Sequence, residues 1–227
     1  MMRSSGGEKM ADKIDQVEAI VQDVIDTDLI DKLSTSLGMG KVLCHGDMWS
    51  TNLIWKKGEN DVDLAAVVDF QVQSFDERQT ALEVPKVLVL HSYSTSYTSC
   101  TLGQTQTVHF GIPTVDIVRV MCACMSGKDR REHWEEILKA FHSYLEEELE
   151  GCNLPYTLDV LKEAYRQYFP FGAFMVVPMI GPLFQMACKS DDTEYKAKVG
   201  EVISEKVECL LEDICEFHRQ NQLRKGA

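Results

Sequence analysis

Residues 42–52, Val-Leu-Cys-His-Gly-Asp-Met-Trp-Ser-Thr-Asn, constrain the fold of this chain more than any other stretch. An apolar strand runs into a His-Gly-Asp turn, and a carboxamide follows the Asp five positions later. A second apolar run then ends at another carboxylate. Three oxygen-bearing side chains, those of Asp47, Asn52 and Asp69, are therefore expected to meet at one place.

The residues between these side chains predict a β-hairpin. Leu53–Trp55 and Leu64–Val68 have the composition of strands, the second of them buried, and residues 56–61 contain Gly and Asn, which favour turns. A hairpin places its first and last residues side by side, so Asn52 and Asp69 are expected to face each other. The alternative is a surface hairpin with incidental polar ends, which leaves the neighbouring His-Gly-Asp turn unexplained.

The three side chains have the chemistry of a magnesium-dependent phosphoryl-transfer site. Mg²⁺ takes oxygen ligands and shares them with substrate phosphates, which suits Asn52 and Asp69, and Asp47 remains to accept a proton. The protein-kinase catalytic loop likewise uses an Asp as base, an Asn on a metal, and the Asp of a later Asp-Phe-Gly on the metals. Here Gly46 replaces the kinase Arg, and Gln71 replaces the Gly.

The pattern His-Gly-Asp-x-x-x-x-Asn at residues 45–52, with Trp49 inside it and Asp-Phe-Gln at residues 69–71, resembles the CHK kinase-like family. That family includes choline-kinase-like and ecdysteroid-kinase-like proteins and is related to the aminoglycoside phosphotransferases. The resemblance covers most of the chain from about Asp12 onward. It implies an α+β, mostly helical fold: the C-terminal lobe of the protein-kinase-like fold with a small catalytic hairpin.

The resemblance also implies an activity and a set of site residues. The activity is transfer of a phosphoryl group from ATP, with Mg²⁺, to the hydroxyl of a small-molecule alcohol. Asp47 corresponds to the catalytic base, and His45 to the residue that orders the loop. Asn52 and Asp69 correspond to the metal ligands. The family's substrates range from amino alcohols to steroids, so the resemblance names no single alcohol.

The chain is expected to form one helical lobe over residues 12–221, after a disordered tail over residues 1–11. Three prolines and two glycines inside the apolar residues 169–188 predict a broken core helix rather than a membrane span. Amphipathic patterns and capping residues predict the other helices at residues 12–25, 116–127, 130–149, 157–169 and from 193 onward.

A complete kinase-like enzyme also carries a β-rich lobe with a phosphate-covering loop and a Lys that pairs the phosphates. The residues before His45 contain neither, so the N-terminal nucleotide lobe is expected to be absent. We therefore expect a fragment, a truncated isoform or an incomplete gene model that is inactive alone. The alternative function is a non-catalytic binding or scaffold module that retains the helical lobe.

Residues 72–106 are out of character, because they are rich in Ser, Thr and Gln and show neither strand alternation nor helical period. In the resembling proteins Asp-Phe-Gln passes within a few positions to Gly-x-Pro and an Asp, here Gly111, Pro113 and Asp116. The segment is either a retained intron translated in frame or a genuine lid loop. Asp116 itself either braces the catalytic loop or simply favours the helix start through its charge.

The composition of the chain excludes some classes of binding partner and of enzyme. A net charge of −13 and a pI near 4.9 argue against nucleic-acid and anionic-membrane surfaces, which need clustered Lys and Arg. Eight scattered cysteines and a polar N-terminus without a signal peptide predict reduced thiols in a cytoplasmic protein. A dinucleotide-binding oxidoreductase is disfavoured, because no Gly-x-Gly-x-x-Gly follows a strand. The oligomeric state stays open.

Overall fold

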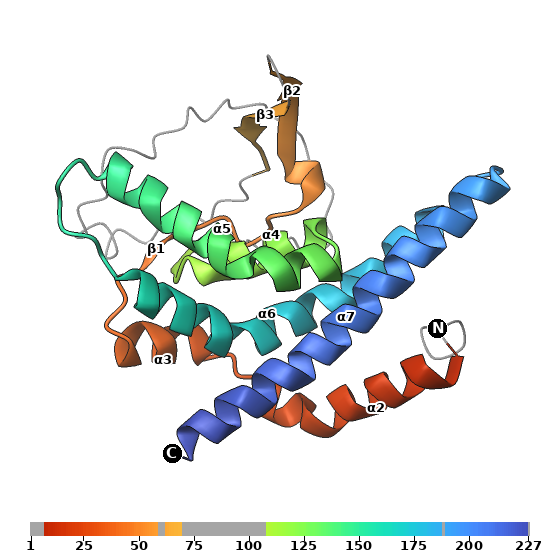
Figure 1. Cartoon of the computed structure of the whole chain (residues 1–227), viewed down its shortest axis with the longest axis horizontal. Coiled ribbons are helices and arrows are strands. Elements are labelled where there is room, and N and C mark those ends of the chain that lie inside the picture. The colour runs from red at the N-terminus through yellow and green to blue at the C-terminus, as the bar shows by residue number, and fades with distance from the viewer. Residues whose placement is uncertain (1–6, 59–61, 70–107, 188, 227) are drawn as a thin grey trace, which may run out of the picture.

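Two long helices, α6 (Leu158–Ala187) and α7 (Thr193–Lys225), form the centre of the structure (Figure 1). The computed structural model describes residues 7–58, 62–69, 108–187 and 189–226. These residues form a mostly helical body with two small two-stranded sheets. The remaining elements are α2 (Gly7–Val24), α3 (Leu29–Ser36), β1 (Val42–Cys44), the 3-10 helix η1 (Ser50–Asn52), β2 (Leu53–Lys57), β3 (Val62–Val67), β4 (His109–Gly111), α4 (Thr114–Cys124) and α5 (Gly127–Glu148).

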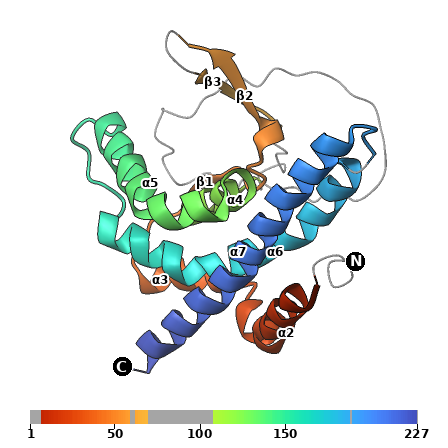
Figure 2. The same ribbon diagram turned by 45° about the vertical axis from the view of Figure 1, so that its right-hand side comes forward.

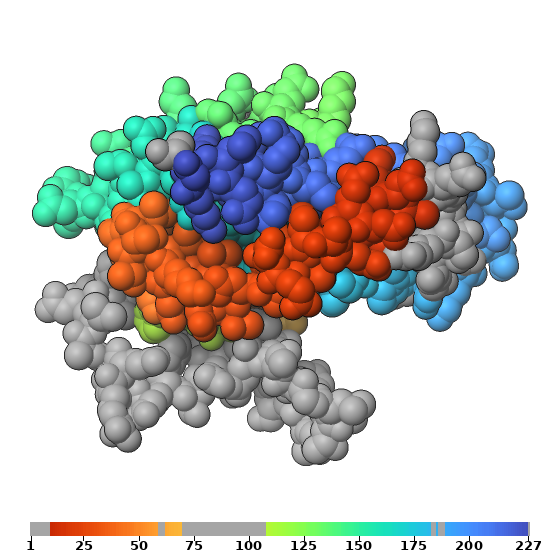
Figure 3. All heavy atoms as spheres, turned by 90° about the horizontal axis from the view of Figure 1, so that it is seen from below, coloured from red at the N-terminus to blue at the C-terminus, as the bar shows by residue number. Residues whose placement is uncertain are grey.

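The hydrophobic core lies between α4, α6 and α7, and α2 lies along α7 (Figure 3). Tyr165, Phe169 and Ile214 are completely or almost completely buried in it, and each such side chain stabilises the fold by about 1.5–3 kcal/mol. Helix α2 begins at Gly7, so the prediction of a disordered tail reaching residue 11 is wrong for residues 7–11. The reason is Met10, which is buried one turn before Ile14 and extends the apolar face.

Helix α6 continues without interruption through Pro170, Pro178 and Pro182, so the prediction of a broken helix is wrong. A proline has no N–H, and Pro170 therefore leaves the carbonyl of Arg166 without its intrahelical donor. Asn221 of α7 supplies that donor, because its Nδ2 group lies 2.9 Å from the Arg166 oxygen. Among the described residues, no helix is both long and apolar enough to span a membrane.

Both sheets are antiparallel and lie on the side of the helical body that carries α4. In one, β1 pairs with β4, with Leu43 opposite Phe110, and this pairing joins the chain before the His-Gly-Asp turn to the start of α4. The other is the predicted hairpin of β2 and β3, which projects from the body (Figure 2). Its second strand was expected to be buried, yet Leu64 is 48% exposed. A two-stranded hairpin is marginally stable alone, so the bonds at its base matter.

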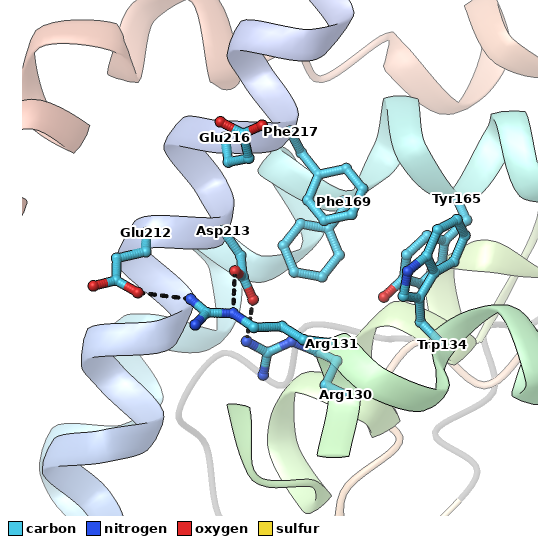
Figure 4. A pocket seen from close by; sticks show the side chains of 9 residues that line it. All are labelled: Arg130, Arg131, Trp134, Tyr165, Phe169, Glu212, Asp213, Glu216 and Phe217. Atoms are coloured by element: carbon cyan, nitrogen blue, oxygen red, sulfur yellow. Dashed lines mark hydrogen bonds and ion pairs between the residues drawn. The ribbon is translucent and has the colours of Figure 1, made fainter. Parts of the chain in front are cut away.

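Charged side chains fasten α5 to α7 beside the aromatic core (Figure 4). Asp213 accepts hydrogen bonds from Arg130 at 2.6 Å and from Arg131 at 2.7 Å, and Arg130 is only 1% exposed. A pocket of about 350 Å³ is lined by these charged side chains together with aromatic side chains of α5, α6 and α7. Its lining contains none of the side chains of the His-Gly-Asp turn. We therefore assign the cluster a structural role.

The first prediction concerns this cluster. Asp213→Asn leaves the charge of Arg130 buried without its counter-ion, which typically costs about 3–5 kcal/mol. We expect the urea midpoint of unfolding to fall accordingly. Glu216→Gln is the matched control, because Glu216 lies one turn further along α7 and pairs with Arg219 at the surface. Such surface pairs contribute little. Equal midpoints for wild type and Asp213→Asn would contradict the assignment.

The second prediction concerns the carbonyl freed by Pro170. Asn221→Ala removes its donor, and an unsatisfied buried group costs about 1–3 kcal/mol. In a Pro170→Ala background, residue 170 has an N–H that can bond to the carbonyl oxygen of Arg166. Asn221→Ala should therefore lower the free energy of unfolding by less in this background than in wild type. A double-mutant cycle by urea unfolding measures this coupling. Gln220→Ala serves as control, because the Gln220 amide bonds to Glu216 of the same helix and not to α6 in the described part of the chain. A coupling of zero would mean that Asn221 does not support the proline.

Candidate active site

The His-Gly-Asp turn leaves β1 and enters η1 with a sharp change of direction at Gly46. Gly46 has φ of 74°, in the left-handed region that glycine adopts without strain. This conformation explains why the position holds Gly where the protein-kinase loop has Arg. Asp47 follows directly, so the backbone of Gly46 sets the direction in which the carboxylate leaves the turn.

Asp116, in the first turn of α4, holds the backbone of this turn. Its Oδ2 accepts a hydrogen bond from the N–H of His45 at 2.6 Å, and its Oδ1 accepts one from the N–H of Gly46 at 2.7 Å. Hydrogen bonds to a charged acceptor are stronger than neutral ones, and here both oxygens are used. The interpretation that Asp116 braces the loop is therefore confirmed, although it also lies in the first turn of its helix.

The ring of His45 joins the turn to the end of the hairpin. Its Nε2 lies 2.9 Å from the carbonyl oxygen of Val68, and its Nδ1 accepts from the N–H of Asp47 at 3.2 Å. A carbonyl oxygen only accepts, so these two contacts fit the tautomer with hydrogen on Nε2. The side chain is 4% exposed, and water therefore has little access to either bond.

Asn52 makes a second connection between the turn and the hairpin. Its Nδ2 donates to the backbone carbonyl oxygen of Asp47 at 2.8 Å, and its own backbone carbonyl oxygen accepts from the N–H of Val68 at 3.0 Å. The register pairs Leu53 with Val67, so Asn52 lies opposite Val68 and next to Asp69 across the hairpin. The backbone therefore places Asn52 and Asp69 at neighbouring positions at the base of the hairpin, as the hairpin prediction requires.

The Asn52 and Asp69 pair has the donor chemistry of a Mg²⁺ site that is completed by substrate. The Nδ2 group of Asn52 is used by Asp47, which leaves its Oδ1 as the amide oxygen for a cation. Asp69 is exposed at the end of β3 with φ of 64°, a left-handed conformation that Asp tolerates better than most residues. In the described part of the chain no group of three or more His, Cys, Asp or Glu has the arrangement of a metal site. Phe70, Gln71 and the interval 72–106 lie outside the described residues.

Two side chains whose contact with Asp47 was not predicted from the sequence bind its carboxylate. Its Oδ1 accepts from the indole Nε1 of Trp49 and from the guanidinium of Arg119, each at 2.6 Å. The Asp47 side chain is 28% exposed, so the carboxylate is still reached from solvent. One signal for Arg119 was present in the sequence, since it is the single basic residue in the apolar helix α4.

Cys44, the last residue of β1, directly precedes the His-Gly-Asp turn. Its thiol is a side chain that can act as a nucleophile in other proteins. Burial raises the pKa of its thiol, and the negative charge of Asp116 raises it further. The sulfur lies 3.3 Å from the carbonyl oxygen of Ile112, where the S–H donates. A thiol held in its protonated form is a poor nucleophile, so Cys44 has a packing role rather than a covalent one.

The comparisons with known proteins place the chain in a family whose activity is not defined. The family model described as "Uncharacterized oxidoreductase dhs-27" (DUF1679) matches residues 2–92 and 101–222. The interruption of this match falls inside the interval 72–106. No solved structure matches the chain.

One curated relative is "Uncharacterized kinase-like protein D1044.1" of Caenorhabditis elegans, which is 25% identical over 141 residues. The matched region is 62% of this chain and 27% of that protein, so this chain spans only a fraction of the relative's length. The similarity to this relative is kinase-like, in agreement with the residues around His45 and Asp47. The family model covers nearly the whole sequence, and the chain therefore belongs to the DUF1679 family.

Proposed function

We propose that this chain contributes the catalytic loop of an ATP-dependent phosphotransferase that acts on a hydroxyl group of a small molecule. The observation that carries the proposal is the set of hydrogen bonds that fixes the His-Gly-Asp turn to Asp116 and joins Asp47 to Asn52. The kinase-like relative supports it independently. In this proposal the described helices and hairpin are the C-terminal lobe of a protein-kinase-like fold.

Each site residue has a definite role in the proposed reaction. Asp47 accepts the proton of the substrate hydroxyl, which requires hydrogen-bonding reach and an accessible carboxylate oxygen. His45 and Asp116 hold the loop that carries Asp47. Asn52 and Asp69 hold Mg²⁺, which neutralises the charge of the ATP phosphates when it is bound.

The description of the family mentions an oxidoreductase, and this chain gives that chemistry little support. Dinucleotide-binding folds use a parallel sheet with a glycine-rich turn between strand and helix. The described strands pair only in antiparallel fashion, and the sequence lacks the glycine fingerprint after a strand.

A binding module is the second candidate, and the hairpin favours it. Ile54, Trp55 and Leu64 are each between 45% and 54% exposed, so the hairpin presents several large apolar side chains to solvent. A module that binds partners through this hairpin needs no nucleotide. Magnesium-dependent nucleotide binding therefore separates the two candidates.

The third prediction concerns the metal. Two protein ligands leave most of the Mg²⁺ coordination shell to water and phosphate, so Mg²⁺ alone should bind weakly and more tightly together with ATP. Calorimetry should show that Asp69→Asn and Asn52→Ala remove the magnesium-dependent part of ATP binding. Asp63→Asn, at the other end of β3, is the matched control and should leave it unchanged. Tight Mg²⁺ binding without nucleotide, or loss of binding in the control, would contradict the assignment.

The fourth prediction separates the base from its support. In a protein that carries this chain together with a nucleotide-binding lobe, Asp47→Asn should lower turnover by about 10²–10⁴-fold, the usual contribution of a positioned base, with ATP affinity close to that of the parent protein. Asp116→Asn should lower turnover and also destabilise the fold by about 1–3 kcal/mol, because it loses an acceptor for a backbone N–H.

The control for Asp116 is Asp159→Asn, another carboxylate in the first turn of a helix. A carboxylate that acts only on the helix dipole contributes about 0.3–1 kcal/mol. Urea unfolding of both variants therefore measures the bracing separately from the dipole. Equal losses of stability would mean that the two bonds to the turn contribute nothing beyond it.

A further inference from the structure

Arg119 places a positive charge directly on the proposed catalytic base. Its NH2 group lies 2.6 Å from Oδ1 of Asp47, and its guanidinium carbon lies 5.0 Å from the centre of the Trp49 ring. Arg119 follows Asp116 by three residues on α4, so both side chains leave the same face of that helix. One helix thus holds the backbone of the turn through Asp116 and the carboxylate of the turn through Arg119.

The guanidinium has more hydrogen-bonding capacity than Asp47 uses. An Arg carries five N–H donors, and the bond to Asp47 occupies one of them. The Nε donor of Arg119 is buried and has no hydrogen-bond partner among the described residues. The side chain as a whole is 20% exposed and that of Asp47 is 28% exposed, so both members of the ion pair reach solvent. An acceptor that approaches the pair from solvent meets a cation with unused donors.

The carboxylate is oriented by the same contacts. Trp49 and Arg119 both donate to Oδ1 of Asp47, and among the described residues no hydrogen bond to its Oδ2 is recorded. The Oδ2 atom is therefore the one that accepts a proton from a substrate hydroxyl. That hydroxyl oxygen lies within about 2.6–3.2 Å of the carboxylate when it reacts, and the phosphorus bonds to it.

We propose, on the basis of the proposed function, that Arg119 is a catalytic residue that contacts the phosphoryl group during its transfer. The acceptor oxygen forms a bond to phosphorus, the bond from phosphorus to the ADP oxygen breaks, and the hydroxyl proton moves to Asp47. Negative charge on the phosphoryl oxygens is stabilised by the guanidinium, whose planar fork fits such oxygens. Stacking on Trp49 keeps the group in place before the reaction, as electrostatic catalysis requires.

The test uses binding rather than turnover. The probes are Mg²⁺ with ADP, and Mg²⁺ with ADP and aluminium fluoride, which mimics a phosphoryl group in transfer. Calorimetry on the full chain should show that Arg119→Gln binds Mg²⁺ and ADP within about twofold of wild type. It should bind the aluminium fluoride complex about 10²-fold more weakly, the usual loss of one donor to transition-state charge. Arg119→Lys retains the charge and should recover part of the difference.

Arg219→Gln is the matched control, because Arg219 also pairs with a carboxylate, Glu216, but lies on the surface of α7. It should bind both probes as wild type does. If Arg119→Gln loses affinity for both probes equally, or for neither, Arg119 does not contact the phosphoryl group and the inference is wrong while the proposed function stands. If wild type binds neither probe, the proposed function fails, and the inference fails with it.

Discussion

The two hydrogen bonds from the turn to Asp116 are the interaction on which the proposed site depends. Strand β1 ends at Cys44 and the backbone at Gly46 has a left-handed conformation, so the N–H groups of His45 and Gly46 lie outside a regular strand or helix. Buried N–H groups need acceptors, and one carboxylate from α4 supplies both. The position of α4 therefore sets the position of the loop. Gly172 of α6 contributes to that position, because a side chain there would collide with Val118 of α4.

The site also resolves an electrostatic difficulty. The chain has a net charge of −13, and a nucleotide that approaches it meets a repulsive field on average. The site counters this locally through Arg119 beside Asp47, and the Mg²⁺ ion that we propose for Asn52 and Asp69 would add to this effect. Both positive charges act over a few ångströms, and the low dielectric of a half-buried site strengthens their attraction to phosphate. The acidic surface and a polyanionic substrate are therefore compatible.

The sequence predicted those features that are determined within a single hairpin or a single helix. The hairpin, the adjacency of Asn52 and Asp69, and the helix that begins at Thr193 all follow from local composition and spacing. The contact of Arg119 with Asp47 joins residues 72 positions apart, and the pairing of β1 with β4 spans a similar interval. The exposure of Leu64 depends on what packs against the hairpin, which no local pattern records. Local sequence patterns therefore identified the side chains proposed to react, but they did not predict the long-range contacts that hold those side chains in place.

The bond between Asn221 and the carbonyl beside Pro170 has a consequence for how this chain tolerates changes in length. A residue inserted into α7 before Asn221 rotates the later side chains by about 100° around the helix axis. The side-chain amide of Asn221 then points away from α6, and the carbonyl oxygen of Arg166 again lacks a hydrogen-bond donor. An insertion in the turn between α6 and α7 does not change the side of α7 that carries Asn221, so the bond from Asn221 to Arg166 can still form. Relatives of this chain that keep a proline at this place should therefore vary in the length of that turn and not in the length of the helix that follows it.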